Sequence, residues 1–338
     1  MTALAIQSQR ELDVICLGRA GVDLYAQQAE QSFNQVSGFN KFVGGSPANI
    51  ATTLAKLGAK AGFIGCVSKD GLGDYVRDYL ASQNIDLTGL CTDASGTRTS
   101  LAVTQMQPND PEVVLYRNNA ADLALTPQQI SADYIKRSKV ILISGTALCA
   151  SPSREAALLA MKLAKQHNTL VVLDIDYRAY SWTDIETASL YYQIAAGLSD
   201  IVIGNTEEFD VFAAINAANG KVSCEQQAQQ LLKDSCQLVI VKAGAEGSII
   251  YQADHAPFKG SVFQVDAKKP FGAGDAFAGT LLFGLINDYS LKDAVAMGAA
   301  SAAINVAGTS CTKASPSFEQ LMHFMNEQNY QFSHDSNR

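Results

Sequence analysis

The chain has 338 residues, of which 47% are hydrophobic and 17% are charged. This length and composition allow a substantial hydrophobic core, which excludes a largely disordered protein. The formal net charge is -8 at pH 7, and such an acidic balance argues against general binding to nucleic acid or to anionic membranes.

The seven cysteines are widely spaced, and no Cys-x-x-Cys pair occurs. An odd number at this spacing indicates neither a disulfide framework nor a zinc site, and it favours a reducing compartment. The longest apolar stretch, at 294–308, is shorter than the roughly 18 residues that suggest a membrane span. We therefore expect a cytoplasmic protein with no membrane partner.

Short runs rich in Val, Ile and Leu alternate along the chain with longer amphipathic segments. The runs predict buried strands, and the amphipathic segments predict helices. Nearly all-apolar strands are typical of a parallel sheet covered by helices on both faces, and such sheets bind ligands beyond the carboxyl ends of their strands. We expect strands at 13–17, 61–67, 139–144, 169–174, 200–203 and 238–242, with helices at 48–57, 72–83, 153–167 and 224–232.

Two regions interrupt this alternation, at about 24–43 and 97–117. Their polar and apolar residues alternate, as in half-exposed antiparallel strands, and their position after sheet strands predicts a small β lid over the site. Beyond Ser248, strands are followed by predicted helices at 273–286, 291–306 and 317–326. The economical interpretation is one domain over 12–328, with loose termini at 1–11 and 329–338.

A loop of small residues, Phe271-Gly272-Ala273-Gly274-Asp275, precedes a predicted helix. Such a loop can bring backbone N–H groups close to an anion at the helix N-terminus. Asp275 would then be a general base beside an anion hole. The alternative is an ordinary acidic residue that interacts favourably with the helix dipole.

Two further motifs open predicted helices. Gly44 and Gly45, followed by Asn49, would let the backbone approach a ligand and offer an amide to its hydroxyl groups. In isolation, a plain loop-to-helix start explains them better. Asn205 and Glu208 follow a strand and can form a capping box, but Glu208 can also orient magnesium or its waters near phosphates. Both interpretations of that pair can hold.

Two common nucleotide motifs are absent from the sequence. No Gly-x4-Gly-Lys-Ser/Thr occurs, and no Gly-x-Gly-x-x-Gly follows the first predicted strand. The missing dinucleotide fingerprint disfavours an NAD-dependent dehydrogenase.

In this order and spacing, the motifs resemble those of the ribokinase-like (PfkB) family of carbohydrate kinases, over essentially 12–328. The resemblance implies a three-layer α/β/α fold with a mostly parallel central sheet and a small β lid. It also implies ATP and Mg²⁺ as cofactors and a small sugar as substrate. Lid strands in such folds often pair between subunits, which would give a homodimer.

The resemblance assigns a role to each motif residue. Asp275 would accept the proton of the sugar's primary hydroxyl as that oxygen attacks the γ-phosphorus of ATP. The N–H groups of Gly272, Ala273 and Gly274 would face the charge that builds on the transferred group. The other assignments are Asp23, Gly44, Gly45 and Asn49 to the sugar, Lys242, Gly244, Gly247 and Asn305 to the nucleotide, and Asn205 with Glu208 to magnesium, through water. For Asn305, a buried packing role is the alternative.

Two arginines bear on the substrate. Arg117 lies on the lid side and Arg178 follows a central strand, and each can bind a carboxylate through two parallel hydrogen bonds. An ordinary ion pair is the alternative for each. Both segments resemble those of kinases acting on keto-deoxy sugar acids. The fuller set 17–25, 174–178, Trp182 and 269–275 is most similar to kinases of 5-dehydro-2-deoxy-D-gluconate, which implies phosphorylation of its 6-hydroxyl in inositol catabolism. The alternatives are a 2-keto-3-deoxygluconate kinase, a fructokinase, or a non-catalytic sugar-binding paralogue, against which the intact motifs argue.

The chain departs from the family pattern just before the Gly272 loop. Many relatives carry an acidic residue there, often beside a monovalent cation, whereas this chain has Lys269-Pro270-Phe271. Our hypothesis is that Lys269, or its neighbour Lys268, supplies the positive charge instead.

Overall fold

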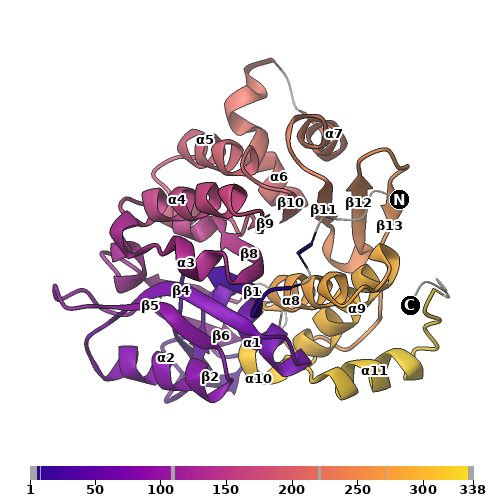
Figure 1. Cartoon of the computed structure of the whole chain (residues 1–338). Coiled ribbons are helices and arrows are strands. Elements are labelled where there is room, and N and C mark those ends of the chain that lie inside the picture. Colours follow the sequence, from indigo (N-terminus) through magenta and orange to yellow (C-terminus); the bar gives the residue numbers. More distant parts are fainter. Residues whose placement is uncertain (1–5, 8, 108–110, 220–221, 270, 334–338) are drawn as a thin grey trace.

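The computed structural model describes residues 6–7, 9–107, 111–219, 222–269 and 271–333. Pro270 and part of the expected lid, 108–110, therefore lie outside the described residues. The described strands form two sheets (Figure 1). The larger has nine strands in the order β13-β12-β11-β10-β9-β8-β1-β4-β5. Its strands are β1 (Leu12–Leu17), β4 (Ala61–Ser68), β5 (Asp86–Asp93), β8 (Ser138–Ser144), β9 (Leu170–Asp174), β10 (Ile201–Asn205), β11 (Leu238–Lys242), β12 (Ser248–Gln252) and β13 (Phe258–Lys259).

The pairing in the larger sheet follows from the connections. Within this sheet, β11, β10, β9, β8, β1, β4 and β5 pair in parallel with their neighbours in that order. The pairs β11–β12 and β12–β13 are antiparallel. Parallel neighbours need a long crossover, which the helices supply, while β11 and β12 are joined by the short loop 243–247. The carboxyl ends of β9, β10 and β11 consequently meet at one edge of the sheet.

Successive residues of each central strand face two different cores, because side chains alternate across a strand. In β1, Val14 and Cys16 enter one core and Ile15 and Leu17 the other. The first core packs against α1 (Ser46–Leu57), α2 (Gly71–Ser82), α8 (Ala273–Ile286), α9 (Leu291–Val306) and α11 (Phe318–Glu327). The second packs against α3 (Ala132–Ile135), α4 (Ser153–Gln166), α5 (Ile185–Ala196), α6 (Thr206–Ala213) and α7 (Cys224–Asp234).

Helix α8 is buried on nearly all sides, between α1 and α9. Small residues make this close packing feasible: a Cβ atom on Gly284 would lie 2.7 Å from the Cβ of Ala294 on α9. A helix that is apolar all round belongs in a protein interior. The N-terminus of α8 is thereby held rigidly at the edge where β9, β10 and β11 end.

The smaller sheet has four strands in the order β3-β2-β6-β7. They are β2 (Gly21–Ala29), β3 (Phe39–Gly44), β6 (Leu101–Met106) and β7 (Val113–Tyr116). Since β3 ends immediately before α1, this lid sheet leaves the main body beside the Gly44–Gly45 turn. Its edge strand β7 exposes 61% of Tyr116, and pairing of the lid with a second subunit stays a prediction.

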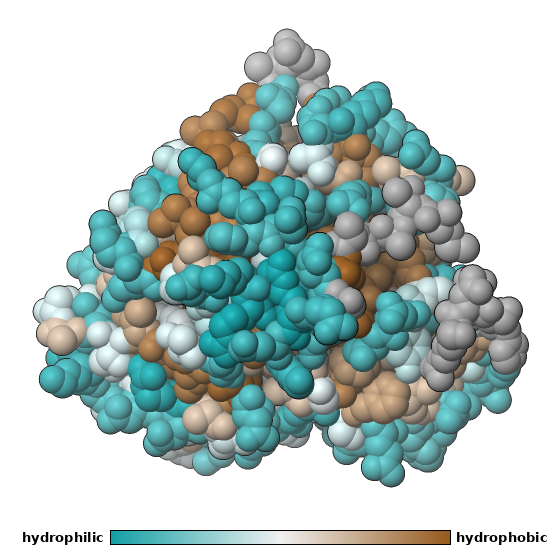
Figure 2. Space-filling view, in the orientation of Figure 1, coloured by the Kyte–Doolittle hydropathy of each residue, from teal (hydrophilic) through white to brown (hydrophobic). Residues whose placement is uncertain are grey.

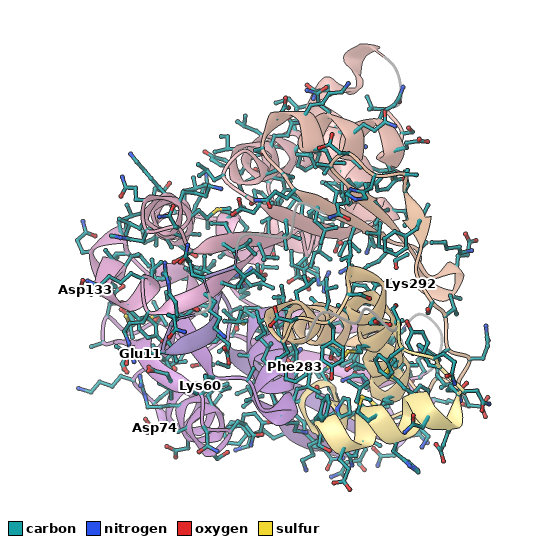
Figure 3. The ribbon with its side chains drawn as sticks, turned by 45° about the vertical axis from the view of Figure 1, so that its right-hand side comes forward. Glu11, Lys60, Asp74, Asp133, Phe283 and Lys292 are labelled. Atoms are coloured by element: carbon teal, nitrogen blue, oxygen red, sulfur yellow. The ribbon has the colours of Figure 1, made fainter. Side chains whose placement is uncertain are left out.

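The visible surface in Figure 2 is largely hydrophilic, with apolar residues in separate patches. Charged side chains such as Asp74 and Asp133 lie at the rim of the molecule (Figure 3). Within the described residues, no helix is long and apolar enough to cross a bilayer. None of the seven cysteines, all of which belong to the described part of the chain, forms a disulfide.

These features confirm the predicted three-layer α/β/α fold, although the chain ends differ from expectation. Arg10 donates to the carbonyls of Lys136 and His167, each at 2.6 Å. The hydroxyl of Tyr330 donates to Asp293 at 2.9 Å. Hydrogen bonds therefore hold these described parts of the termini, while 1–5, 8 and 334–338 lie outside the described residues. The sequence also gave no signal for strand β5, whose burial is only partial.

Candidate active site

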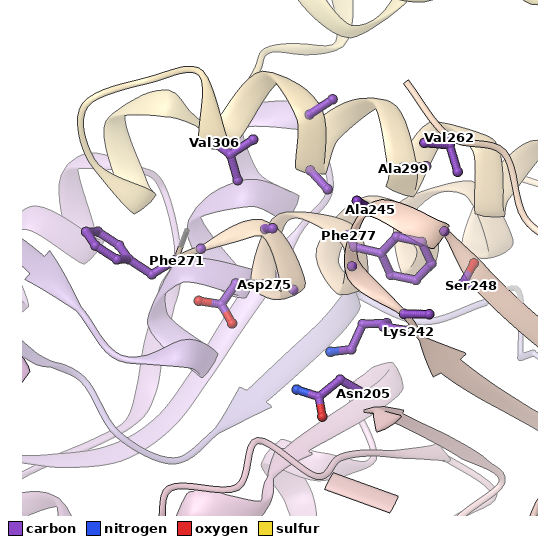
Figure 4. Close-up of a pocket in the computed structure, with 18 of the residues that line it drawn as sticks. Asn205, Lys242, Ala245, Ser248, Val262, Phe271, Asp275, Phe277, Ala299 and Val306 are labelled. Carbon is purple, nitrogen blue, oxygen red and sulfur yellow. The ribbon is translucent and has the colours of Figure 1, made fainter. Parts of the chain in front are cut away.

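A cavity of about 770 Å³ opens where β9, β10 and β11 end. Asp174, Asn205 and Lys242, the last residues of these three strands, line one side of it. The turn before α8 and its first residues line another, and the side chains of Asp275, Lys242 and Asn205 face the same space in Figure 4. The remaining wall is largely apolar and is formed by Val262, Phe263, Val265, Phe277, Ala299, Ala302, Ala303 and Val306.

A hydrogen bond joins the two glycine motifs beside this cavity, which Asp275 lines and Gly44, Gly45 and Asn49 do not. The Nδ2 of Asn49 donates to the Oδ2 of Asp275 at 2.7 Å, across 226 positions of sequence. The Oδ1 of Asn49 is buried and has no hydrogen-bond partner among the described residues. One amide group thus positions the carboxylate, while its own oxygen is left without a partner among the described residues.

The environment of Asp275 shifts the pKa of its carboxyl group. Burial and the nearby negative charge of Asp176 raise its pKa from 3.8 to about 6, while the hydrogen bond from Asn49 opposes the shift. A carboxyl group with a pKa near 6 is ionised at neutral pH yet holds a proton more tightly than an ordinary aspartate. This is the range in which a general base is effective.

The turn before α8 depends on glycine. Gly272 has φ 89°, in the left-handed region that other residues enter at a cost. It is followed by Ala273 and Gly274, which also line the cavity. The first N–H groups of a helix have no partner within the helix, and binding of an anion by this turn stays a prediction.

Asp23 lies on lid strand β2 and is 8% exposed. Burial raises its pKa, and the guanidinium of Arg19, 3.3 Å away, opposes that shift. A Cβ atom on Gly44 would lie only 2.0 Å from the Asp23 carboxylate, so only glycine fits at position 44. Tyr25 on the same strand packs against Phe271 with ring centroids 5.2 Å apart, which joins the lid to the turn before α8.

Lys242 ends β11 and contacts Asp174 at the end of β9, with 3.4 Å between Nζ and Oδ1. Burial raises the pKa of Asp174 to about 7; Lys242 opposes this shift, while neighbouring carboxylates, Glu208 first, add to it. Burial by itself would lower the pKa of Lys242, but Asp174 and the other carboxylates raise it overall. A Cβ atom on Gly274 would lie 3.2 Å from Nζ, so this ammonium lies beside the turn before α8. Gly244 and Gly247 follow it in the cavity wall.

Asn205 and Glu208 form the expected capping box at the start of α6. Asn205 Oδ1 accepts from the Glu208 N–H at 2.8 Å, and Glu208 Oε2 accepts from the Asn205 N–H at 2.7 Å. Glu208 Oε1 also accepts from the Tyr177 N–H at 3.2 Å. Both residues line the cavity, so the cap fixes the Glu208 carboxylate where it can also orient water molecules.

The two arginines have different environments. Arg178 lines the cavity and pairs with Asp176 at 2.7 Å, and that carboxylate raises the pKa of Arg178. Arg117 is buried, and its Nε and Nη2 both donate to Asp122, at 2.9 and 2.7 Å. A further bond from Nη2 reaches the carbonyl of Thr146 at 3.0 Å. Both arginines therefore form ion pairs, the alternative that the sequence left open. The pair of Arg117 is buried in the interior, and Arg178 is the arginine that lines the cavity.

Asn305 is 1% exposed, so it presents no surface to a nucleotide. Its Oδ1 accepts from Lys269 Nζ at 2.7 Å, and its Nδ2 donates to the Cys311 carbonyl at 2.8 Å. The expected contact with adenine is thus replaced by the alternative of internal packing. Lys269 is fully buried and Lys268 is exposed, so of the two lysines Lys269 is the one that lies in the interior beside Asn305.

Several cavity residues escaped the sequence-based reasoning. Asp174 and Asp176 had no assigned role, although carboxylates at the carboxyl end of a predicted strand were a usable signal. The alternation of apolar and polar residues over 263–268 was left without an interpretation, and the Ala-rich α9 gave no indication of which residues face the cavity.

Comparison with known proteins assigns the chain to a protein family. Residues 11–317 match the model of the pfkB family carbohydrate kinases. The chain is 55% identical to a 5-dehydro-2-deoxygluconokinase of Photobacterium profundum, over 96% of this chain and 98% of that protein. It is 41% identical to another from Geobacillus kaustophilus, over 97% of each. The fructokinase of Xylella fastidiosa with bound ATP has the same fold, with a TM-score of 0.84 and 23% identity over 94% of this chain and 99% of that one. The chain belongs to the pfkB family of carbohydrate kinases.

Proposed function

We propose that this kinase is a 5-dehydro-2-deoxygluconokinase, which transfers the γ-phosphoryl group of ATP to the 6-hydroxyl of 5-dehydro-2-deoxy-D-gluconate. The products would be 6-phospho-5-dehydro-2-deoxygluconate and ADP, in a step of inositol catabolism. The observation that carries the reaction type is Asp275, tuned to a pKa of about 6 beside the anion-binding turn. The substrate rests on the relatives of that name and on Arg178.

The proposed chemistry needs little beyond alignment and charge stabilisation. The sugar oxygen forms a bond to the γ-phosphorus while the bond from that phosphorus to the β,γ-bridging oxygen breaks, and the hydroxyl proton passes to Asp275. Asn49 holds the carboxylate in place. The N–H groups of Gly272, Ala273 and Gly274 face the charge on the transferred group, where preorganised donors act most strongly.

The rest of the cavity suits a nucleotide. The apolar wall of 261–267 and α9 offers a slot for a flat base, and Lys242 stands where phosphates would approach the turn. Asp174 and Glu208 line the cavity beside Lys242, while no group of three or more possible ligands gathers for direct metal binding in the described part of the chain. This fits Mg²⁺, which keeps several waters and is bound largely by substrate phosphates. When bound, the ion would neutralise phosphate charge.

The sugar side is argued from Asp23, Asn49 and Arg178. Asp23 is a buried acceptor for hydroxyl groups, and the free Oδ1 of Asn49 is another. Arg178 uses Nη2 for Asp176 and Nη1 for the Tyr177 carbonyl. A guanidinium has five N–H donors, so capacity remains for the carboxylate of a sugar acid.

A substrate panel tests the proposal. Initial rates of ADP release are measured with ATP and Mg²⁺ on 5-dehydro-2-deoxygluconate, 2-keto-3-deoxygluconate and fructose. The highest kcat/KM is expected for the first. A higher value for either of the other two would reassign the substrate within the family, and no ADP release with any sugar would support the non-catalytic alternative.

A further inference from the structure

Lys269 is a charged side chain with no exposed surface, among the largest fully buried side chains of the described structure. No ion pair of Lys269 occurs among the described residues. Burying a cation without a carboxylate is costly, and burial lowers the pKa of Lys269, with Cys311 and Asp275 opposing the shift. The free-energy cost of burying this ammonium calls for an explanation.

The contacts of the ammonium point to the anion-binding turn. Lys269 Nζ donates to the carbonyl of Phe271 and to Oδ1 of Asn305, both at 2.7 Å. The backbone N–H of Lys268 is anchored on the last residue of α9, donating to the carbonyl of Val306 at 2.8 Å. Lys269 therefore ties the turn that begins α8 to the end of α9.

The bond to Phe271 fixes the direction of one peptide group. The carbonyl of Phe271 and the N–H of Gly272 belong to the same planar unit, in which they point in opposite directions. With the carbonyl held inward by Lys269, the N–H of Gly272 is directed outward, and Gly272 lines the cavity. The turn has no room to shift inward, because a Cβ atom on Gly272 would already lie 2.7 Å from Asn305 Oδ1 and 2.6 Å from Cys311 Sγ.

We infer that Lys269 is a positioning residue for phosphoryl transfer, a built-in cation that orients the Gly272 N–H and adds positive potential behind the anion-binding turn. This inference rests on the proposed kinase activity. It implies that a dissolved monovalent cation is not needed at this point, because the ammonium is covalently part of the chain.

The test compares three full-length variants. Lys269→Met keeps the length of the side chain and removes the charge, Lys269→Ala opens a space, and Lys268→Met is the matched control at the exposed neighbour. We expect kcat of Lys269→Met to fall by about 10²-fold, the range for losing one anion-hole donor, with the KM for the sugar changed less than about 3-fold. Lys268→Met should match the wild type. In Lys269→Ala, added ammonium or potassium ions should restore part of kcat with saturation, which a purely structural loss would not show.

The outcomes separate the inference from the proposed function. If the wild type phosphorylates its sugar and folded Lys269→Met, checked by circular dichroism, turns over within about 3-fold of it, the inference is wrong. If the variants do not fold, the wild type alone decides: at constant ionic strength, exchanging potassium for tetramethylammonium should leave kcat unchanged, and strong activation by potassium would overturn the inference. A wild type without kinase activity refutes the proposed function instead.

Discussion

Replacing Asp275 by Asn should make the enzyme slower and more stable at the same time. The slower rate follows from the loss of the proton acceptor, a role that contributes about 10²–10⁴-fold. The higher stability of the variant follows from removing a buried carboxylate, because burial raises the carboxyl pKa of Asp275 from 3.8 to about 6. A difference of this size corresponds to on the order of 3 kcal/mol between the ionised and protonated forms at most.

The sign of the stability change depends on whether the folded or the unfolded protein binds the proton of Asp275 more tightly. The folded protein has the higher pKa, so ionised Asp275 destabilises the fold above about pH 6, and this effect fades as pH falls toward the unfolded value. Asn is neutral at every pH and can still accept a hydrogen bond from Asn49. We therefore expect Asp275→Asn to raise the free energy of unfolding at pH 8 and to raise it less at pH 5.

Urea unfolding at both pH values measures the stability, and a coupled assay of ADP release measures kcat. Asp78→Asn, at an exposed position on α2, is the control and should change neither quantity. In the wild type, kcat should fall as the pH drops below about 6, because Asp275 then carries a proton. Wild-type turnover by Asp275→Asn would remove Asp275 from the base role, and a stability gain equal at both pH values would refute the burial argument.

The other predictions concern the charged residues around the cavity. Arg178→Ala should raise the KM for a sugar acid about tenfold or more, because a charged hydrogen bond is lost. The KM for fructose should rise much less. Equal increases in initial-rate assays would refute the assignment of Arg178 to the substrate carboxylate. Arg117→Met should cost about 3–5 kcal/mol in urea unfolding because it leaves Asp122 buried without its partner, whereas an unchanged midpoint would contradict the buried ion pair. Lys242→Met should raise the Kd for ATP about tenfold in calorimetry, and unaltered affinity would place the phosphates away from this ammonium.

Local sequence determined most of the elements, because strands and helices follow from periodicity over a few neighbouring residues. The run 238–242 predicted strand β11 with its bounds, and 273–286 and 291–306 did so for α8 and α9. The glycines at 44 and 272 marked positions where the backbone can approach a ligand closely. The capping box of Asn205 and Glu208 could also be predicted, since its two partners are three residues apart.

Only the tertiary structure decided which of these side chains contact each other and which already have partners within the protein. Asn49 and Asp275 are 226 positions apart, and no local pattern states that one donates to the other. Sequence could not distinguish Arg117 from Arg178, or Lys269 from Lys268, because each pair has the same chemistry and differs only in burial and partners. Those depend on the packing of α8 and α9 against the sheet and on the lid that β2 and β3 carry over it. Residue type therefore set what each side chain could do, and the long-range contacts set what it does.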